Sequence, residues 1–310
     1  MQSILITGGN RGLGYELAAE VLENNPQTQL VISARSKEQF EQAKSNLAER
    51  LKRQDLNIKF IQLDLLDKSS VEAAVESLKH QNVKLDVLVN NAAVWSNKLY
   101  PTVGHDDITV NFVHTRLFTE LLLQNGFFNN GFRIINISAI AGNITILKKE
   151  EHRKEFRDAR LNNINALADK WIDIIDNQKK AHEYIDISKA FALPYAVSKL
   201  CLNVYTRYVA LDKIITDNNG GIVAVHPGVA NTNLVTRDQT DDKTHDPSQP
   251  LIKIPENTMF NKIEEGVWGA LSCIKMSDQD FKKLNGKFTD RKLNQFDFLD
   301  ASVDFVAHAF

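Results

Sequence analysis

A tyrosine and a lysine four residues apart form the pair of side chains in this sequence best suited to moving a proton. Tyr195 and Lys199 follow Pro194, a residue that favours the first turn of a helix, and their spacing places both on one helix face. A phenol is protonated at neutral pH because its pKa is about 10, and a nearby cation lowers that pKa. The pair therefore predicts general acid catalysis, with Tyr195 as the acid and Lys199 as the assisting cation.

A second chemical signal is a glycine-rich turn near the start of the sequence. The apolar run 4–6 predicts a buried strand, and apolar residues at helical spacing over 13–22 predict an amphipathic helix after the glycines. Unpaired N–H groups at a helix start carry partial positive charge, and glycines let a pyrophosphate approach them closely. We therefore expect a dinucleotide site, although the same glycines could form a tight turn that binds nothing. The residues expected to contact the nucleotide are Gly8, Asn10, Arg11, Gly12, Leu13 and Gly14.

The end of the second expected strand, 29–35, indicates which dinucleotide is bound. A carboxylate at this position in a dinucleotide-binding fold bonds the 2′-hydroxyl of the adenosine ribose. This sequence has Ala34 and Arg35 there, and Arg11 lies in the turn, so two guanidinium groups could bind a 2′-phosphate instead. The pattern favours NADP(H) over NAD(H). The alternative for Arg35 is a solvated residue at the start of a helix.

Strand-like and helix-like stretches alternate along the whole chain. Further strands are expected at 58–65, 85–91, 132–137 and 222–226, with helices between them. This alternation predicts an α/β fold, a doubly wound parallel sheet with helices on both faces, in a single domain. Asp64, followed by Leu65, ends the third strand at the edge where ligands bind in such sheets. It could accept a hydrogen bond from the adenine amine or cap the next helix.

The composition argues against several classes of function. A formal net charge of −2 over 310 residues offers no basic surface for nucleic acid or an anionic membrane. No apolar stretch approaches the length that spans a membrane, and the glycine turn begins too early for a signal peptide to precede it. Cys201 and Cys273 lack metal-ligand spacing, so we expect no metal site and a cytoplasmic protein with core thiols.

A series of motifs, in order and on the expected elements, resembles the short-chain dehydrogenase/reductase family over residues 1–290. The motifs are Thr7 to Gly14, Asn90 to Ala93, Asn111, a serine segment after the fifth strand, Tyr195 with Lys199, and Pro227-Gly228 before Thr232. The resemblance implies a Rossmann-like fold and hydride transfer with a nicotinamide cofactor. It implies further cofactor contacts at Asn91, Pro227, Gly228, Val229 and Thr232. By the same resemblance, Lys199 holds the nicotinamide ribose and Asn111 holds a water that links Lys199 to solvent.

The sequence departs from the family pattern at two positions. Ala93 stands where the family has glycine. After the fifth strand, counting back three residues from Gly142 places Ala139, not Ser138, at the position of the catalytic serine. Because neighbouring residues at a strand end point to opposite faces, Ser138 replaces that serine only if the chain bends there.

A long insertion, 143–190, precedes the Tyr195 segment. It is charged over 148–155, and its later apolar residues recur at helical spacing, at Ile164, Leu167, Trp171, Ile174 and Ile175. Such an insertion resembles the carbonyl reductase branch of the family, whose helical segment covers a surface used elsewhere for oligomerisation, so a monomer is expected. The apolar stripe is expected to be buried against its own domain; the alternative is a partner-binding helix. The tail, 291–310, could pack on the domain or be disordered.

These observations lead to one expected function and two alternatives. We expect NADPH-dependent reduction of a ketone, aldehyde or quinone to an alcohol, with Tyr195 as the proton donor. The alternatives are an NADP-dependent alcohol dehydrogenase and an NADP(H)-binding sensor that has lost turnover through Ala139. Trp95 and Trp268 are candidate walls of the substrate pocket, with core packing as the equal alternative for Trp268. The polar run 236–249 is expected to form a loop over the substrate site.

Overall fold

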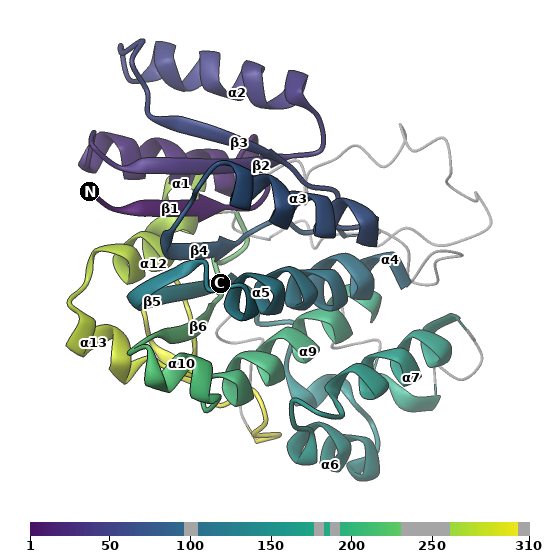
Figure 1. Ribbon diagram of the computed structural model, residues 1–310. Coiled ribbons are helices and arrows are strands. Elements are labelled where there is room, and N and C mark those ends of the chain that lie inside the picture. The colour runs from purple at the N-terminus through teal and green to yellow at the C-terminus, as the bar shows by residue number, and fades with distance from the viewer. Residues whose placement is uncertain (96–104, 177–182, 187–192, 231–260, 303–310) are drawn as a thin grey trace.

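The computed structural model describes residues 1–95, 105–176, 183–186, 193–230 and 261–302 (Figure 1). Within these residues, eight strands form one sheet in the order β3-β2-β1-β4-β5-β6-β7-β8. Strands β1 to β7 run parallel, and β8 is antiparallel to β7. The bounds are β1 Ser3–Ile6, β2 Gln29–Ala34, β3 Ile58–Gln62, β4 Leu85–Asn90, β5 Phe128–Ile137, β6 Gly221–Val225, β7 Phe288–Thr289 and β8 Gln295–Phe296. This confirms the predicted doubly wound sheet.

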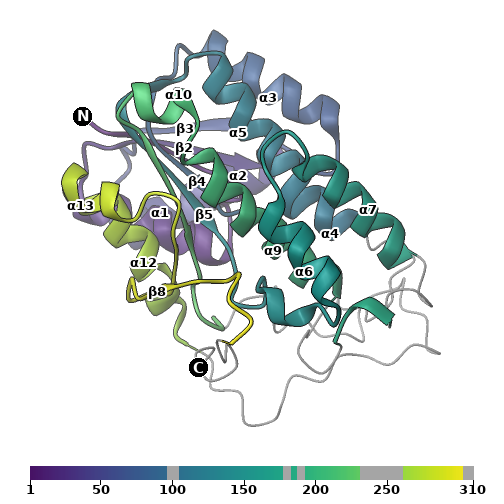
Figure 2. The same cartoon turned by 90° about the horizontal axis from the view of Figure 1, so that it is seen from below.

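Helices cover both faces of the sheet and form two apolar cores with it (Figures 1 and 2). One face carries α1 Gly12–Asn24, α2 Lys37–Arg50, α12 Ile263–Lys275 and α13 Asp278–Lys283. The other carries α3 Lys68–His80, α4 His105–Ile108, the π-helical turn η1 Thr109–His114, α5 Thr115–Gln124, α9 Leu193–Val209 and α10 Lys213–Asp217. Because the sheet is buried on both faces, its central strands are continuous apolar runs rather than alternating ones.

The insertion folds back onto its own domain. It contains a short 3₁₀ turn, η2 Ile144–Ile146, and two helices, α6 Glu150–Asp158 and α7 Ile164–Asp176. Helix α7 packs against α4 and α9, and α6 packs against α9. The stripe residues Ile164, Trp171, Ile174 and Ile175 are buried, and Leu167 is partly buried. The apolar stripe is therefore buried against its own domain, as expected, and is not exposed for a partner helix.

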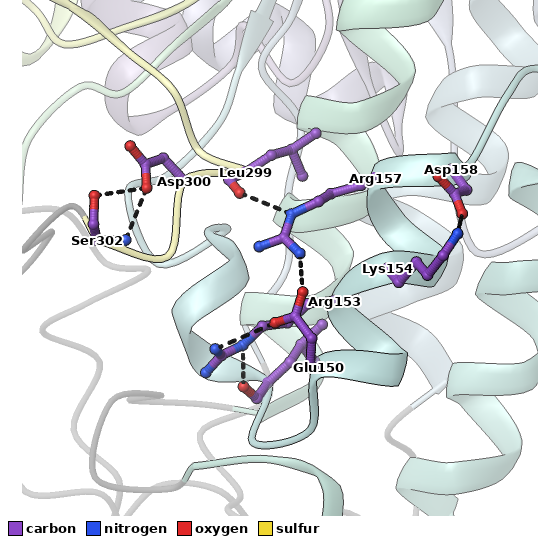
Figure 3. Close-up of polar contacts among 9 residues, drawn as sticks. Glu150, Arg153, Lys154, Arg157, Asp158, Leu299, Asp300 and Ser302 are labelled. Atoms are coloured by element: carbon purple, nitrogen blue, oxygen red, sulfur yellow. Dashed lines mark hydrogen bonds and ion pairs between the residues drawn. The ribbon is translucent and has the colours of Figure 1, made fainter.

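The described part of the tail, 291–302, also packs on the domain. Strand β8 extends the sheet, and Phe298 is buried while its carbonyl oxygen accepts a hydrogen bond from the Ile144 N–H at 2.9 Å. Arg157 of α6 donates to the Leu299 carbonyl oxygen at 3.3 Å and forms an ion pair with Glu150 (Figure 3). The tail therefore holds the insertion against the sheet edge. The expected boundary between the domain and the tail, at residue 290, stays a prediction.

None of the described helices is long and apolar enough to cross a membrane. Among the same residues, no group of three or more His, Cys, Asp or Glu side chains is arranged to hold a metal ion.

Candidate active site

One cavity of about 650 Å³ follows the carboxyl ends of the parallel strands. It is lined by residues that come directly after each of the strands β1 to β6, which is the edge where ligands bind in open parallel sheets. The expected site residues that line it are Gly8, Asn10, Arg11, Gly12, Leu13, Arg35, Asp64, Leu65, Asn91, Ser138, Tyr195, Lys199, Pro227 and Gly228. The fold thus brings the glycine turn and the tyrosine–lysine pair together in one cavity.

Three expected residues that the structure describes are not in that lining. Gly14, Asn111 and Val229 are described but do not line the cavity. Thr232 and the expected loop 236–249 lie outside the described residues. The lining also includes residues that the motifs did not single out as contacts, namely Ser33, Gln39, Leu63, Leu66, Ala92, Val94, Val110, Ile137 and Ala230. Except for Gln39, each of them lies within or directly beside a motif, and that position was the only sequence signal for it.

The glycines of the turn are required by close packing. Gly8 and Gly12 have φ angles of +62° and +57°, in the left-handed region that favours glycine. A Cβ at Gly14 would lie 2.4 Å from Asn91 Nδ2 and 2.5 Å from the Gly8 carbonyl oxygen. Gly14 therefore acts behind the cavity wall, by letting the start of α1 approach the turn and the loop after β4.

Asn91 and Thr7 join the turn to the loop after β4. Thr7 Oγ1 accepts hydrogen bonds from the Asn91 N–H at 2.9 Å and the Ala92 N–H at 3.0 Å. In return, Asn91 Nδ2 donates to the Thr7 carbonyl oxygen at 2.8 Å. These hydrogen bonds fix the position of the glycine turn relative to the loop after β4, although the two segments are far apart in sequence.

Two arginines line the cavity, Arg11 in the turn after β1 and Arg35 directly after β2. Both are exposed, and β2 ends without a carboxylate. Asp64 also lines the cavity, and its Oδ1 accepts a hydrogen bond from the Leu66 N–H at 3.0 Å. The suggested capping role of Asp64 is wrong, because Asp67 caps α3 by accepting from the Ser69 N–H at 2.8 Å.

Tyr195 and Lys199 lie together on α9. Lys199 Nζ is 5.5 Å from the centre of the Tyr195 ring and donates to the Ile137 carbonyl oxygen at 2.8 Å. Burial lowers the pKa of Lys199 to about 7, an effect that the Asp107 carboxylate opposes. Burial also raises the pKa of Tyr195, and Asp107 raises it further. We expected Lys199 to lower the pKa of Tyr195; in this structure burial dominates instead, and the phenol is protonated throughout the neutral range.

Asn111 lies behind the tyrosine–lysine pair, in the π-helical turn η1. Its side chain accepts from the Val94 N–H and donates to the Val94 carbonyl oxygen, both at 2.9 Å. It also donates to Ser198 Oγ at 3.0 Å, and that hydroxyl donates to the Tyr195 carbonyl oxygen at 2.7 Å. Asn111 thus connects the loop after β4 to the helix that carries the pair. Its expected water-holding role stays a prediction.

Ser138 and Ala139 are placed differently. Ser138 lines the cavity, but its hydroxyl donates to Asn203 Oδ1 on α9 at 2.6 Å and is therefore engaged within the protein. Asn203 Nδ2 in turn donates to the Gly142 carbonyl oxygen at 2.8 Å. Ala139 is buried and offers only a methyl group. The loop also lies directly against α9, because a Cβ at Gly142 would lie 2.5 Å from the Lys199 carbonyl carbon.

The remaining expectations concern aromatic and buried side chains. Trp95 lines the cavity with its ring centre 5.9 Å from that of Tyr195, as a pocket wall would. Trp268 on α12 is 47% exposed and does not line the cavity, so neither the pocket-wall nor the core interpretation holds for it. Cys201 and Cys273 are free and buried.

The chain is similar to known oxidoreductases. Residues 2–149 match a family model described as short chain dehydrogenase. The sequence is 26% identical to (+)-neomenthol dehydrogenase of Arabidopsis thaliana over 229 residues, which are 66% of this chain and 76% of that protein. It is 28% identical to carbonyl reductase (NADPH) 3 of Mus musculus over 246 residues, 76% of this chain and 83% of that protein.

Solved structures show the same fold. Salutaridine reductase from Papaver somniferum has a TM-score of 0.71 at 20% identity, and the match covers 93% of this chain and 99% of that one. The NADPH-bound carbonyl reductase from chicken fatty liver has a TM-score of 0.60 at 21% identity, covering 96% of this chain and 98% of that one.

Proposed function

The chain belongs to the short-chain dehydrogenase/reductase family of oxidoreductases, and we propose that it reduces a carbonyl group of a small molecule to an alcohol with NADPH. One observation carries the proposal: one cavity is lined by a glycine turn with Arg11, by Arg35 at the end of β2, and by the pair of a partly buried Tyr195 and a buried Lys199. The glycine conformations and the close approach at Gly14 fit a dinucleotide, whose pyrophosphate would lie at the start of α1. NADPH supplies a hydride when bound.

The chain's own residues would supply the proton. As the carbonyl carbon is reduced, negative charge develops on its oxygen, which therefore needs a donor beside it. Tyr195 carries that proton because burial raises its pKa. Once the proton leaves, the phenolate faces the Lys199 amine, which is held by the Ile137 carbonyl oxygen. Lys199 in its ammonium form would stabilise the phenolate and return a proton to it.

The ionisation of Tyr195 supports reduction over oxidation. An alcohol dehydrogenase needs the phenolate as a base, and burial disfavours that form. One observation favours the sensor alternative: Ala139 has no donor, and the Ser138 hydroxyl is engaged with Asn203.

A steady-state assay tests the proposal. The purified protein is given NADPH and a panel of aliphatic, alicyclic and aromatic ketones, aldehydes and quinones, and oxidation of NADPH is followed by its absorbance. We expect turnover with at least one of these classes. Tight NADPH binding without turnover on any of them would contradict the enzyme and support the sensor.

The two arginines predict a preference for NADPH over NADH. A charge-assisted hydrogen bond contributes about 1.5–3 kcal/mol, so Arg35→Ala should weaken NADPH binding about tenfold or more and leave NADH binding nearly unchanged. Dissociation constants measured by fluorescence titration check this. Lys37→Ala is the matched control, because Lys37 is an exposed cation at the start of α2 outside the cavity lining. Equal affinities of the unmodified protein for both cofactors would contradict the preference.

We also propose that the protein is a monomer and works in the cytoplasm. The first proposal rests on α6 and α7, which cover α9 within the chain itself. The second rests on the two free, buried cysteines. Sedimentation equilibrium at micromolar concentration should give the mass of one chain, and a stable dimer or tetramer would overturn the monomer.

A further inference from the structure

The first glycine of the turn is held by side chains from both sides. Strand β1 lies between β2 and β4 in the sheet, so the turn that follows it has the ends of both strands beside it (Figure 1). On the β4 side, Asn91 Nδ2 donates to the Gly8 carbonyl oxygen at 3.3 Å. On the β2 side, Ser33 Oγ accepts a hydrogen bond from the Gly8 N–H at 3.0 Å. Both backbone polar groups of Gly8 therefore have side-chain partners.

Ser33 is the β2 member of this arrangement. It lies one residue before the end of β2, it is buried, and it lines the cavity. The turn lies close over this end of the strand, because a Cβ at Gly9 would be 3.1 Å from Ile32 Cγ2. Gly8 has a left-handed φ of +62°, so the chain turns sharply as it leaves β1. A hydrogen bond that fixes the Gly8 N–H therefore fixes the direction in which the turn begins.

The hydrogen bond from Gly8 to Ser33 also determines which amides can bind a phosphate. The Gly8 N–H is taken up by Ser33 and is not available to a ligand. The amides at the start of α1 are available, because Arg11 provides no side-chain cap there and the first turn of the helix has no acidic residue. The position of these amides relative to the sheet depends on the turn that leads to them, and Ser33 holds the beginning of that turn.

We propose that Ser33 is a positioning residue for the cofactor, whose hydroxyl holds the Gly8 N–H and so places the glycine turn to receive the pyrophosphate of the dinucleotide. This inference rests on the proposed function, because it requires a dinucleotide at the start of α1. The pyrophosphate is common to NADPH and NADH, whereas Arg35 is expected to contact the 2′-phosphate that only NADPH carries. Loss of the Ser33 hydroxyl should therefore weaken the binding of both cofactors by the same factor, unlike loss of Arg35.

The first experiment measures the dissociation constants of NADPH and NADH by fluorescence titration of the full-length protein. Ser33→Ala should weaken the binding of both about fivefold, the factor typical of one neutral hydrogen bond, and Ser33→Thr, which keeps the hydroxyl, should restore it. Ser3→Ala is the matched control and should change neither affinity. Its hydroxyl donates to Gln29 Oε1 at 3.4 Å between the same two strands, at the end away from the cavity. Unchanged affinities in Ser33→Ala, or a loss for NADPH alone, would overturn the proposal.

A second readout needs neither cofactor nor turnover. Hydrogen exchange of the Gly8 amide, followed by NMR in ¹⁵N-labelled protein, should be about fivefold or more faster in Ser33→Ala and unchanged in Ser3→Ala. An exchange rate that stays the same in Ser33→Ala would overturn the contact on which the proposal depends. If no carbonyl compound is reduced but both cofactors bind more weakly to Ser33→Ala, the proposed reduction fails and the role of Ser33 stands. If turnover is present and the affinities do not change, the inference alone fails.

Discussion

Tyr195→Phe is expected to abolish carbonyl reduction and to leave NADPH binding almost unchanged. The substitution removes one hydroxyl, the proton donor to the developing alkoxide, and general acid catalysis contributes about 10²–10⁴ to a rate. The ring remains in its place beside Trp95, so the shape of the cavity is kept. Single-turnover oxidation of bound NADPH by the best substrate of the panel measures the loss, and fluorescence titration measures binding.

Tyr205→Phe provides the matched control for this prediction. Tyr205 lies on the same helix and is buried, and its hydroxyl has no hydrogen-bond partner among the residues that the structure describes. Its loss should leave kcat within about twofold and cost little stability. A Tyr195→Phe variant that keeps more than a tenth of the activity would mean that another group or a water supplies the proton.

Ala139→Ser is expected to raise kcat at least tenfold. A serine hydroxyl at this position would donate a second hydrogen bond to the substrate oxygen, and removing one such donor in other enzymes costs about 10²–10³ in rate. The methyl group of Ala139 makes no such bond, so the present protein should be a slow reductase rather than an inactive one. The comparison is made with kcat at saturating NADPH and substrate.

Ser138→Ala distinguishes the two possible registers of this loop. Its hydroxyl donates to Asn203 Oδ1, so its loss leaves a buried acceptor unsatisfied, at a cost of about 1–3 kcal/mol. We therefore expect a lower melting temperature and a nearly unchanged kcat. If Ser138→Ala is instead as damaging to kcat as Tyr195→Phe, then Ser138 is the donor and the assignment of position 139 is off by one.

The elements of the site could be predicted because their signals are local. The apolar run before Gly8 and the helical spacing after Gly14 are properties of consecutive residues, and the structure forms β1 and α1 there. The alternation of such stretches determines a parallel sheet, and a parallel sheet places the carboxyl ends of its strands at one edge. That is why motifs spread from Gly8 to Gly228 line one cavity.

What the tertiary structure decided depends on residues that are distant in sequence. The exposure of Trp268 and the packing of the tail depend on neighbours that are distant in sequence and that no local pattern identifies. The same holds for charge. The sequence placed Lys199 one turn from Tyr195 and predicted a lowered phenol pKa, but burial raises it, and the carboxylate of Asp107 comes from another helix. A pKa is set by desolvation and by charges across space, so only the packing of the folded chain around Tyr195 could determine it.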